Sequence, residues 1–432
     1  MKLDVLILGG GAAGLAAARK LTVAGVNVLI LEARARLGGR IHTLRDSLLP
    51  VPVEMGAEFV HGMPGETWEI IHAARLPAVE LQMGDEFQNT HGRLRSVHDI
   101  FQQMQSKLKQ LKNAKPGENF AQRMGREITA RDEMAYAYVE GFDAAFPNDL
   151  SAKAIWDAEQ QSHEEDGNRQ FRFINGGYQA VVNWLHDACD PAHLRVKLNT
   201  PVRMIRWRRG RVEMDSGDRS YSAPQAIITL PLGMLKENTV KFDPPISEKR
   251  EAIEGLAMGP VVKIILIFRE PFWEAQDKFK NLSFIYSRHR HVPTWWTFLP
   301  VRTAALTGWA GGPAAARLSG KSPKRITALA TEALAELTGW NLRMIRAQLL
   351  SAHVADWQSD IFSRGAYSYI KAGGEDAARI LAEPIDHTLF FAGEATHTQG
   401  QSGTVAGALA SGYRAAGEVL GDNCATTNPF AR

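Results

Sequence analysis

The first forty residues constrain the fold more than any other stretch of this chain. The apolar run 4–8 leads directly into Gly9-Gly10-Gly11-Ala12-Ala13-Gly14, and an alanine-rich stretch with helical character continues to about residue 24. A second apolar run, 28–31, ends on Glu32. This order of strand, glycine turn, helix, strand and acid is typical of the βαβ unit that binds dinucleotides. It predicts an α/β protein with a Rossmann-type domain.

Each position of this fingerprint has a physical role. Gly9 permits the tight turn, Gly11 lets backbone N–H groups approach a pyrophosphate, and Gly14 lets the helix pack closely on the strand. The helix N-terminus adds positive potential for phosphates. Glu32 can accept hydrogen bonds from ribose hydroxyls. A bare carboxylate at this place disfavours a 2′-phosphate, so NADP is not expected.

Composition places few further limits on the chain. Its 432 residues predict two domains, and 45% hydrophobic and 22% charged residues are ordinary for a globular protein. The net charge of +3 indicates no polyanionic partner. The basic run 206–211 is typical of the exposed end of a hairpin rather than of a nucleic-acid patch. Cys189 and Cys424 are too few for a disulfide framework or a thiolate metal site.

The termini and the remaining polar clusters suggest a cytoplasmic protein. The first apolar run is already the first strand, so no secretory leader is expected, and no stretch has the length of a membrane span. The tract Ser287-Arg288-His289-Arg290-His291 lacks the spacing of metal ligands and is expected to be a solvated loop. We therefore predict no metal, no nucleic-acid partner and no membrane partner, with a monomer or homodimer as the assembly.

The residues after Glu32 indicate which dinucleotide is bound. Residues 32–40 read E-A-R-x-R-x-G-G-R, which resembles the FAD-binding signature of the flavin-containing amine oxidases, a family of monoamine oxidases, polyamine oxidases and histone demethylases. The resemblance implies FAD, with Arg34 and Arg40 beside its adenosine and diphosphate. Residues 56–62 contain G-A-x-x-V-H-G, which is similar to the polyamine-oxidase form of a flavin-contacting loop. His61 in this motif suggests a polyamine oxidase.

A second group of motifs resembles the part of the family that surrounds the isoalloxazine. Trp357, Phe362 and the run 364–368 match the arrangement W-x(4)-aromatic-x-R-G-x-Y. In monoamine oxidases a cysteine before this tyrosine links covalently to the flavin. Ala366 takes that position here, so FAD is expected to be bound non-covalently. Lys263, inside the apolar run 261–268, is either an edge or bulge residue or the family's lysine that reaches flavin N5 through a water.

The C-terminal motifs complete the resemblance. F-A-G-E-x-T and S-G-T-V-x-G-A place Glu394 near the ribityl chain, and the N–H groups of a helix start stabilise negative charge on the flavin. Thr404 replaces a second tyrosine of monoamine oxidases. The strand valine Val202 would contact the adenine. The residues expected to bind FAD are Gly9, Gly11, Ala13, Gly14, Glu32, Ala33, Arg34, Gly39, Arg40, Gly56, Ala57, Glu58, Phe59, Val202, Gly393, Glu394, Thr404 and Val405.

The resemblance covers nearly the whole chain in the right order. It implies a discontinuous FAD domain from 1–75, 195–243 and 385–432. An α+β substrate domain would be formed by 76–194 and 244–384. Its mainly helical segment 97–150 either roofs a cavity or simply packs on the sheet. The residues expected to act in catalysis are Lys263, Tyr367, Trp357, Phe362 and His61.

The implied reaction is the oxidation of a polyamine or primary amine to an imine and then an aldehyde, with dioxygen reduced to hydrogen peroxide. A distal ammonium could be attracted by Asp157, Glu159 and the run 164–166, although a solvated loop is the simpler interpretation. An L-amino-acid oxidase would need an arginine clamp for the carboxylate. A histone demethylase is disfavoured because no long coiled-coil insertion is evident. A non-catalytic flavoprotein scaffold is the alternative outside enzymes.

Overall fold

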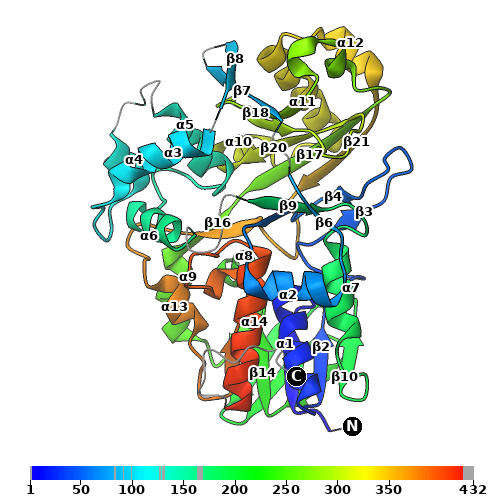
Figure 1. The fold of residues 1–432 in the computed structure, drawn as a ribbon. Helices are drawn as coiled ribbons and strands as arrows, with labels where there is room; N and C mark the ends of the chain where they lie inside the picture. The colour runs from blue at the N-terminus through cyan, green and yellow to red at the C-terminus, as the bar shows by residue number, and fades with distance from the viewer. Residues whose placement is uncertain are drawn as a thin grey trace.

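The computed structural model describes residues 2–81, 84–90, 92–98, 100–125, 128, 132–162 and 169–421, apart from the side chains of 101–103 and 162. Cys424, the acidic run 164–166 and the C-terminal segment 422–432 lie outside this description. Figure 1 shows two parts. A parallel sheet with α1 and α14 against it occupies one end, and a larger mixed sheet with α11 and α12 occupies the other.

The parallel sheet develops from the glycine-rich fingerprint. Its order is β10-β2-β1-β14-β23, and each neighbouring pair of strands is parallel. Three distant stretches of the chain therefore meet in one sheet, and their strand ends and following turns face the same side. The strands are β1 (Val5–Leu8), β2 (Val28–Leu31), β10 (Leu194–Lys197), β14 (Gln225–Ile228) and β23 (Leu389–Phe391).

One apolar core joins this sheet to its helices. Alanines of α1 and Gly412 of α14 allow the two helices to approach closely, since a Cβ on Gly412 would lie 2.2 Å from the carbonyl oxygen of Ala13. Val181 and Leu185 of α7 belong to the same core. Helix α7, which precedes the expected domain boundary at residue 195, therefore packs in the same core as α1. The helices are α1 (Ala12–Val23), α2 (Gly65–Ala73), α7 (Gln179–Asp187) and α14 (Val405–Leu420).

A four-stranded sheet has the order β13-β12-β11-β15. Its first three strands in sequence follow β10, and its last strand, β15, follows β14. The basic run 206–211 forms the β11–β12 hairpin, as expected. Val202 was expected on a strand, but it lies in the segment between β10 and β11, where Pro201 interrupts strand pairing. The elements are β11 (Met204–Arg208), β12 (Arg211–Asp215), β13 (Ser220–Ala223), α8 (Leu232–Lys236) and β15 (Lys241–Asp243).

The second part is organised by a seven-stranded sheet in the order β21-β17-β20-β19-β18-β7-β8. The run 261–268 is β17, buried along its whole length between β20 and β21. Helices α10–α12 cover one face of this sheet and share its apolar core. The elements are β7 (Asp85–Thr90), β8 (Arg93–Val97), β17 (Val261–Phe268), β18 (Leu282–Tyr286), β19 (Thr294–Trp296), β20 (Ala305–Gly311), α10 (Gly312–Leu318), α11 (Pro323–Thr338), α12 (Leu342–Gln348) and β21 (Leu349–Asp356).

Short elements join the two parts. Helices α3–α6 form a group with its own apolar core beside the large sheet. Small sheets pair β3 with β4, β16 with β22, and β9 with both β5 and β6. Their bounds are β3 (Thr43–Leu44), β4 (Val53–Glu54), β5 (Phe59–His61), β6 (Ala78–Glu80), α3 (Ile100–Leu108), α4 (Phe120–Met124), α5 (Glu133–Gly141), α6 (Ala152–Ser162), β9 (Gln170–Phe173), α9 (Arg250–Gly255), β16 (Leu256–Gly259), β22 (Tyr367–Ile370) and α13 (Ala377–Ala382).

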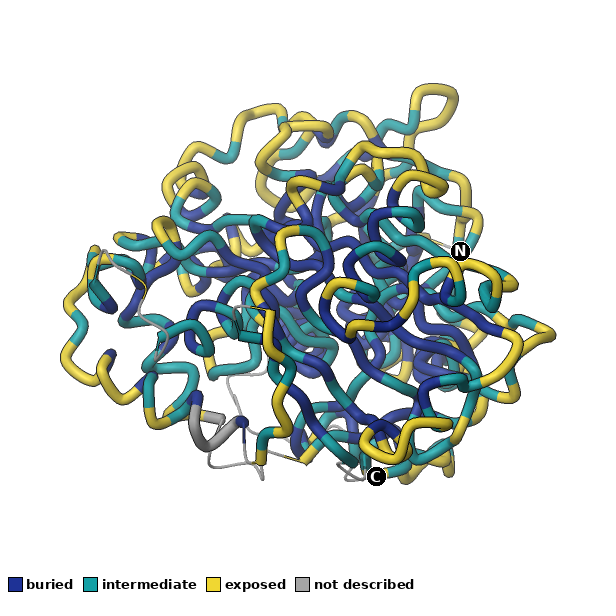
Figure 2. The backbone as a smooth tube through the Cα atoms, turned by 90° about the horizontal axis from the view of Figure 1, so that it is seen from above, coloured by how far each residue is buried: buried dark blue, intermediate teal, exposed yellow. Residues whose placement is uncertain are grey.

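Figure 2 shows buried backbone through the middle of the molecule and exposed loops around its edge. Within the described ranges, no helix is both long enough and apolar enough to cross a membrane. Among the same residues, no group of three or more His, Cys, Asp or Glu side chains is arranged to hold a metal ion.

The close contact of α1 with α14 predicts an unusual response to alanine. Gly→Ala inside a helix normally stabilises by ~1 kcal/mol. Gly412→Ala should instead lower the melting temperature, because overpacking against the Ala13 backbone costs ~1–3 kcal/mol. Gly65→Ala is the control, since a Cβ there meets nothing within 4 Å. Thermal melting of the two variants checks this, and a Gly412→Ala melting point at or above the wild-type value would contradict the packing.

Candidate active site

A cavity of about 1010 Å³ lies between the two parts of the chain. Its wall includes every residue that was expected to act in catalysis, and every residue expected to bind FAD except Gly14. Gly14 lies behind the wall, where a Cβ would be 2.0 Å from the carbonyl oxygen of Gly9. Side chains of α3, α5 and α6 also line the cavity, so this helical group forms its roof as well as packing on the sheet.

The glycine turn leaves room for a ligand at the N-terminus of α1. Gly9 has a φ of +110°, and a Cβ there would meet Thr229 Oγ1 at 2.5 Å. A Cβ on Gly11 would meet only the Gly38 carbonyl, at 3.9 Å. Gly11 caps α1 without a side-chain hydrogen bond, so the first-turn N–H groups can bind an anion. These residues fit the diphosphate of FAD.

Glu32 holds the turn together. Its buried carboxylate accepts hydrogen bonds from the Gly10 N–H at 2.7 Å and from the Arg34 N–H at 2.8 Å. Unused lone pairs remain for ribose hydroxyls. The Arg34 guanidinium forms two hydrogen bonds with Asp360, at 2.9 and 2.6 Å, and lies 5.3 Å from the centre of the Phe362 ring. These contacts attach the second half of the chain to the nucleotide end of the cavity.

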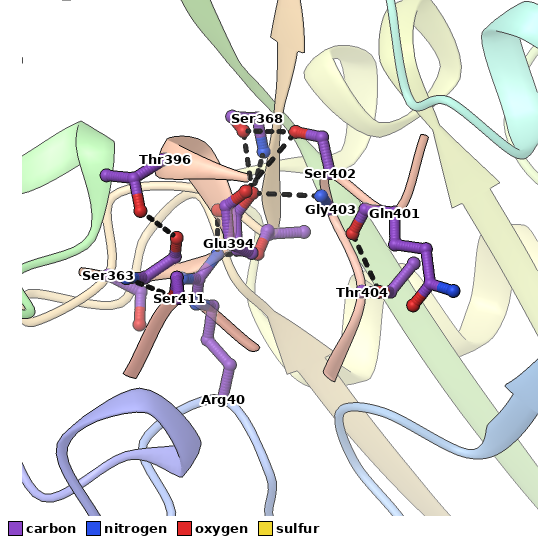
Figure 3. Close-up of polar contacts among 12 residues, drawn as sticks. Arg40, Ser363, Ser368, Glu394, Thr396, Gln401, Ser402, Gly403, Thr404 and Ser411 are labelled. Atoms are coloured by element: carbon purple, nitrogen blue, oxygen red, sulfur yellow. Dashed lines mark hydrogen bonds and ion pairs between the residues drawn. The ribbon is translucent and has the colours of Figure 1, made fainter. Parts of the chain in front are cut away.

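Glu394 connects four segments of the site (Figure 3). One carboxylate oxygen accepts from Arg40 Nη1 at 2.7 Å, and the other from Ser368 Oγ at 2.6 Å and from the Gly403 N–H at 3.1 Å. Thr404 Oγ1 caps α14 by accepting from the Gly407 N–H. A Cβ on Gly393 would meet nothing within 4 Å, so the backbone beside Glu394 is open to a ligand.

The aromatic end of the cavity lies around Trp357 and Tyr367, which pack with Trp309 and Ala366. Trp357 Nε1 donates to the Met55 carbonyl at 3.0 Å, and Tyr367 Oη donates to the Phe142 carbonyl at 2.5 Å. Both rings are therefore fixed in orientation. Phe362 lies outside this cluster, against Arg34. We therefore assign Phe362 to the cofactor end of the cavity rather than to the wall that faces an amine.

Lys263 is neither an edge nor a bulge residue. β17 has partners on both sides, and the register of its pairing with β21 shifts only further along the strand, at Ile267/Phe268. The Lys263 side chain is 1% exposed, and its Nζ lies 2.6 Å from Glu58 Oε2 and 3.2 Å from the Gly56 carbonyl oxygen. Glu58 was expected only as part of a cofactor-binding loop. The structure shows it to be the ionic partner of Lys263.

Two carboxylates face the aromatic end of the cavity from its roof. Asp143 follows α5, and its buried Oδ2 has no hydrogen-bond partner among the described residues. Burial, and then the nearby charge of Glu159, raise the pKa of Asp143 to about 8. Glu159 Oε1 accepts from Tyr138 Oη at 3.0 Å. Asp157, in contrast, pairs with Lys153 at 2.6 Å.

His61 and Phe142 form the apolar side of this region, with ring centroids 5.4 Å apart. Burial lowers the pKa of His61 to about 4, so its ring is neutral at pH 7. The neutral imidazole therefore adds no positive charge that would repel an alkylammonium group.

Sequence reasoning missed several residues of the site. Asp143 lies in no motif, and Asp360 and Arg172 act through partners that are more than a hundred residues away. The adjacent tryptophans Trp295 and Trp296 take different places in the structure. Trp295 is fully buried in the sheet core, whereas Trp296 lines the cavity. Strand alternation along β19 explains this division, since neighbouring side chains point to opposite faces.

Comparisons with known proteins agree with this geometry. The sequence model of the family described as flavin containing amine oxidoreductase matches residues 12–126 and 86–420. Polyamine oxidase 3 of Oryza sativa subsp. japonica is 31% identical over 96% of this chain and 88% of that protein. Lysine-specific histone demethylase 2 of Homo sapiens is 27% identical over 96% of this chain, which spans 53% of that protein.

Solved structures show the same fold. Cyclohexylamine oxidase from Brevibacterium oxydans IH-35A superposes with a TM-score of 0.82 at 22% identity, covering 98% of this chain and 99% of that one. Wild-type putrescine oxidase bound to putrescine gives 0.80 at 20% identity, with the same coverage. The chain belongs to the flavin-containing amine oxidoreductase family. It is an oxidoreductase that acts on amines, and its cofactor is FAD.

The position of Glu32 predicts the effect of removing its carboxylate. Glu32→Ala leaves the Gly10 and Arg34 N–H groups without their acceptor and removes the acceptor for ribose hydroxyls. Unpaired buried donors cost ~1–3 kcal/mol, so FAD should bind roughly 5- to 150-fold more weakly. Titration of apoprotein with FAD measures this, with Glu213→Ala on the β11–β12 hairpin as the control. Unchanged affinity in Glu32→Ala would show that the acid does not organise the site.

Ala366 predicts the mode of FAD attachment. Its methyl group packs beside Trp357 and offers no nucleophile for a covalent bond to the flavin. Acid precipitation should therefore release yellow flavin into the supernatant. Colour that remains in the pellet would contradict non-covalent binding.

Proposed function

We propose that this protein oxidises a diamine or polyamine at one carbon–nitrogen bond and passes the electrons to dioxygen, giving hydrogen peroxide. The observation that carries the proposal is the carboxylate pair Asp143 and Glu159 at the aromatic end of the cavity. The resemblance to proteins named polyamine oxidase and putrescine oxidase supports the same substrate class.

FAD supplies the two-electron chemistry, and the residues of the chain position and desolvate the amine. Trp357 and Tyr367 present apolar ring surface on which the reacting end of the substrate can lie. Desolvation there lowers the pKa of an amine, so the neutral form is favoured. Two electrons and two protons leave the carbon–nitrogen unit as an imine forms. Water hydrolyses the imine to an aldehyde and releases the nitrogen as ammonia or a shorter amine. Dioxygen takes up the electrons and protons as hydrogen peroxide.

The other end of the substrate is the part that Asp143 and Glu159 would recognise. A second ammonium group entering this region gives Asp143 Oδ2 the partner that it lacks among the described residues. A hydrogen bond between charged groups contributes ~1.5–3 kcal/mol. The neutral His61 adds no repulsion. The roof therefore selects substrates that carry a cationic group separated from the reacting amine.

Lys263 occupies a different wall, beside Gly56 and Trp296. Electron transfer to dioxygen develops negative charge, which a fixed ammonium group stabilises. Oxidation of the amine makes the substrate carbon more positive and gains less from a cation. We therefore assign Lys263 to the reaction with dioxygen.

An L-amino-acid oxidase is less well supported. Such a site needs an arginine to bind the substrate carboxylate. Three arginines of the cavity wall, Arg34, Arg40 and Arg379, already pair with carboxylates. The fourth, Arg203, follows Val202, which is expected beside the adenine.

Anaerobic mixing with an amine panel tests the proposed function. Bleaching of the flavin absorbance by putrescine or spermidine, followed by peroxide formation when air is admitted, is the expected result. Bleaching by phenethylamine alone or by amino acids alone would refute the substrate class. No bleaching by any amine would refute the enzymatic role.

Asp143 predicts a distinctive dependence on pH. An alkylammonium with a pKa near ~10.4 stays charged from pH 6 to 8. Because the pKa of Asp143 is raised to about 8, its carboxyl must lose a proton to bind this group below that pH. The apparent affinity for a diamine, divided by that for a monoamine of equal length, should therefore rise from pH 6 to 8 and then level off.

Asp143→Asn should remove this pH dependence. It should also raise the KM for diamines by roughly tenfold or more, because one charged hydrogen bond is lost. The KM for monoamines should change little. Asp157→Asn is the matched control, since Asp157 already pairs with Lys153. Equal losses for diamines and monoamines in Asp143→Asn would contradict the assignment of the distal ammonium to this carboxylate.

A further inference from the structure

A buried group of charges lies behind the wall that carries Lys263. Lys263 comes from β17, Glu58 from the loop before β5, and Arg172 from β9. Their side chains are 1%, 7% and 6% exposed. β5 and β9 pair in register at Phe59 and Arg172, so the arginine is fixed next to the Glu58 loop.

The Glu58 carboxylate is shared by three donors. Oε2 binds Lys263 Nζ at 2.6 Å. Oε1 accepts from Arg172 Nη2 and from Trp296 Nε1, the latter at 3.1 Å. Burial opposes ionisation of Glu58, but Lys263 and Arg172 outweigh it and lower its pKa below the ordinary value. Glu58 is therefore ionised throughout the neutral range.

The aromatic rings around the group restrict its geometry further. The Arg172 guanidinium lies 5.4 Å from the centre of the Phe59 ring and 5.0 Å from that of Phe298. Lys263 Nζ lies 5.9 Å from the centre of the Trp296 ring. The ammonium group consequently has one place to occupy, which is fixed by an anion on one side and by the Gly56 carbonyl on the other.

Glu54 is the remaining charged residue of this region. Its carboxylate accepts from the Tyr178 N–H and from Thr43 Oγ1, both at 2.7 Å. Burial raises the pKa of Glu54 to about 7. Below that pH the three remaining charges, one negative and two positive, leave the wall with a net charge of about +1.

We propose that Glu58, supported by Arg172, is a positioning residue for Lys263 that also sets the charge of the cavity wall against which the flavin ring is bound. The proposal rests on the role given to Lys263 in the proposed function. Removing the carboxylate alone would release the ammonium group and add one positive charge. Removing the ammonium alone would subtract one. Removing both would restore the charge of the wild-type wall.

The reduction potential of bound FAD measures this charge directly, because reduction adds negative charge to the flavin and nearby fixed charges tune it. The potential is determined by dye equilibration during slow reduction by xanthine and xanthine oxidase at pH 5.5, with no amine present. Glu58→Gln should raise the potential, Lys263→Met should lower it, and the double variant should return it close to the wild-type value.

Glu54→Gln is the matched control. The glutamine side chain of this variant can accept from the Tyr178 N–H through its carbonyl oxygen and donate to Thr43 through its amide nitrogen. At pH 5.5 the carboxyl that it replaces is mostly protonated, so the potential should not change. If Glu58→Gln fails to fold because its two cations are left buried, the Lys263→Met variant and the double variant still isolate the carboxylate. The double variant should then have the higher potential of the two.

Equal potentials in that pair, or in Glu58→Gln and the wild type, would overturn the proposal. This outcome is independent of the substrate. If diamines bleach the flavin but the variants leave its reduction potential unchanged, the proposed function stands and this inference is wrong. If the variants shift the reduction potential but no amine bleaches the flavin, this inference stands and the proposed function is wrong.

Discussion

The buried carboxylate of Glu394 is the contact on which the cavity depends most. It lies just after β23 and binds Arg40 from the N-terminal motif, Ser368 from β22 and the backbone before α14. Removing one partner of a buried ion pair costs ~3–5 kcal/mol. A chain that brings three distant stretches into one parallel sheet needs such a contact, because strand pairing alone does not fix the loops at the ends of the strands.

Two further ion pairs between distant segments line the cavity. Arg34 with Asp360 joins the nucleotide end to the loop after β21, and Lys263 with Glu58 joins the large sheet to the loop before β5. Each pair links the two parts of the chain and satisfies a charge that would be costly to bury alone. The carboxylate of Asp143 is the exception, since its buried Oδ2 has no partner among the described residues. In the proposed function, a cationic group of the substrate would be the partner of Asp143 Oδ2.

Local sequence was sufficient for the elements that carry strong patterns. The run 4–8, the glycine turn and Glu32 specify their own βαβ unit, and 261–268 is a strand with the expected bounds. Contacts between distant residues left no local signal. The pairing of Lys263 with Glu58 spans about two hundred residues, and Asp143 gains its raised pKa only where α5 meets α6. Phe362 was placed by motif alone, and it lies against Arg34 rather than in the cluster of Trp357 and Tyr367.

The central claim is that the cavity recognises a second cationic group. Its most direct test compares putrescine with pentylamine, because the two have the same length and differ only in the terminal group. Anaerobic stopped-flow at pH 8 gives the apparent Kd for flavin reduction by each amine. The account predicts tighter binding of putrescine, with the difference lost in Asp143→Asn. Pentylamine binding as tightly as putrescine would contradict it.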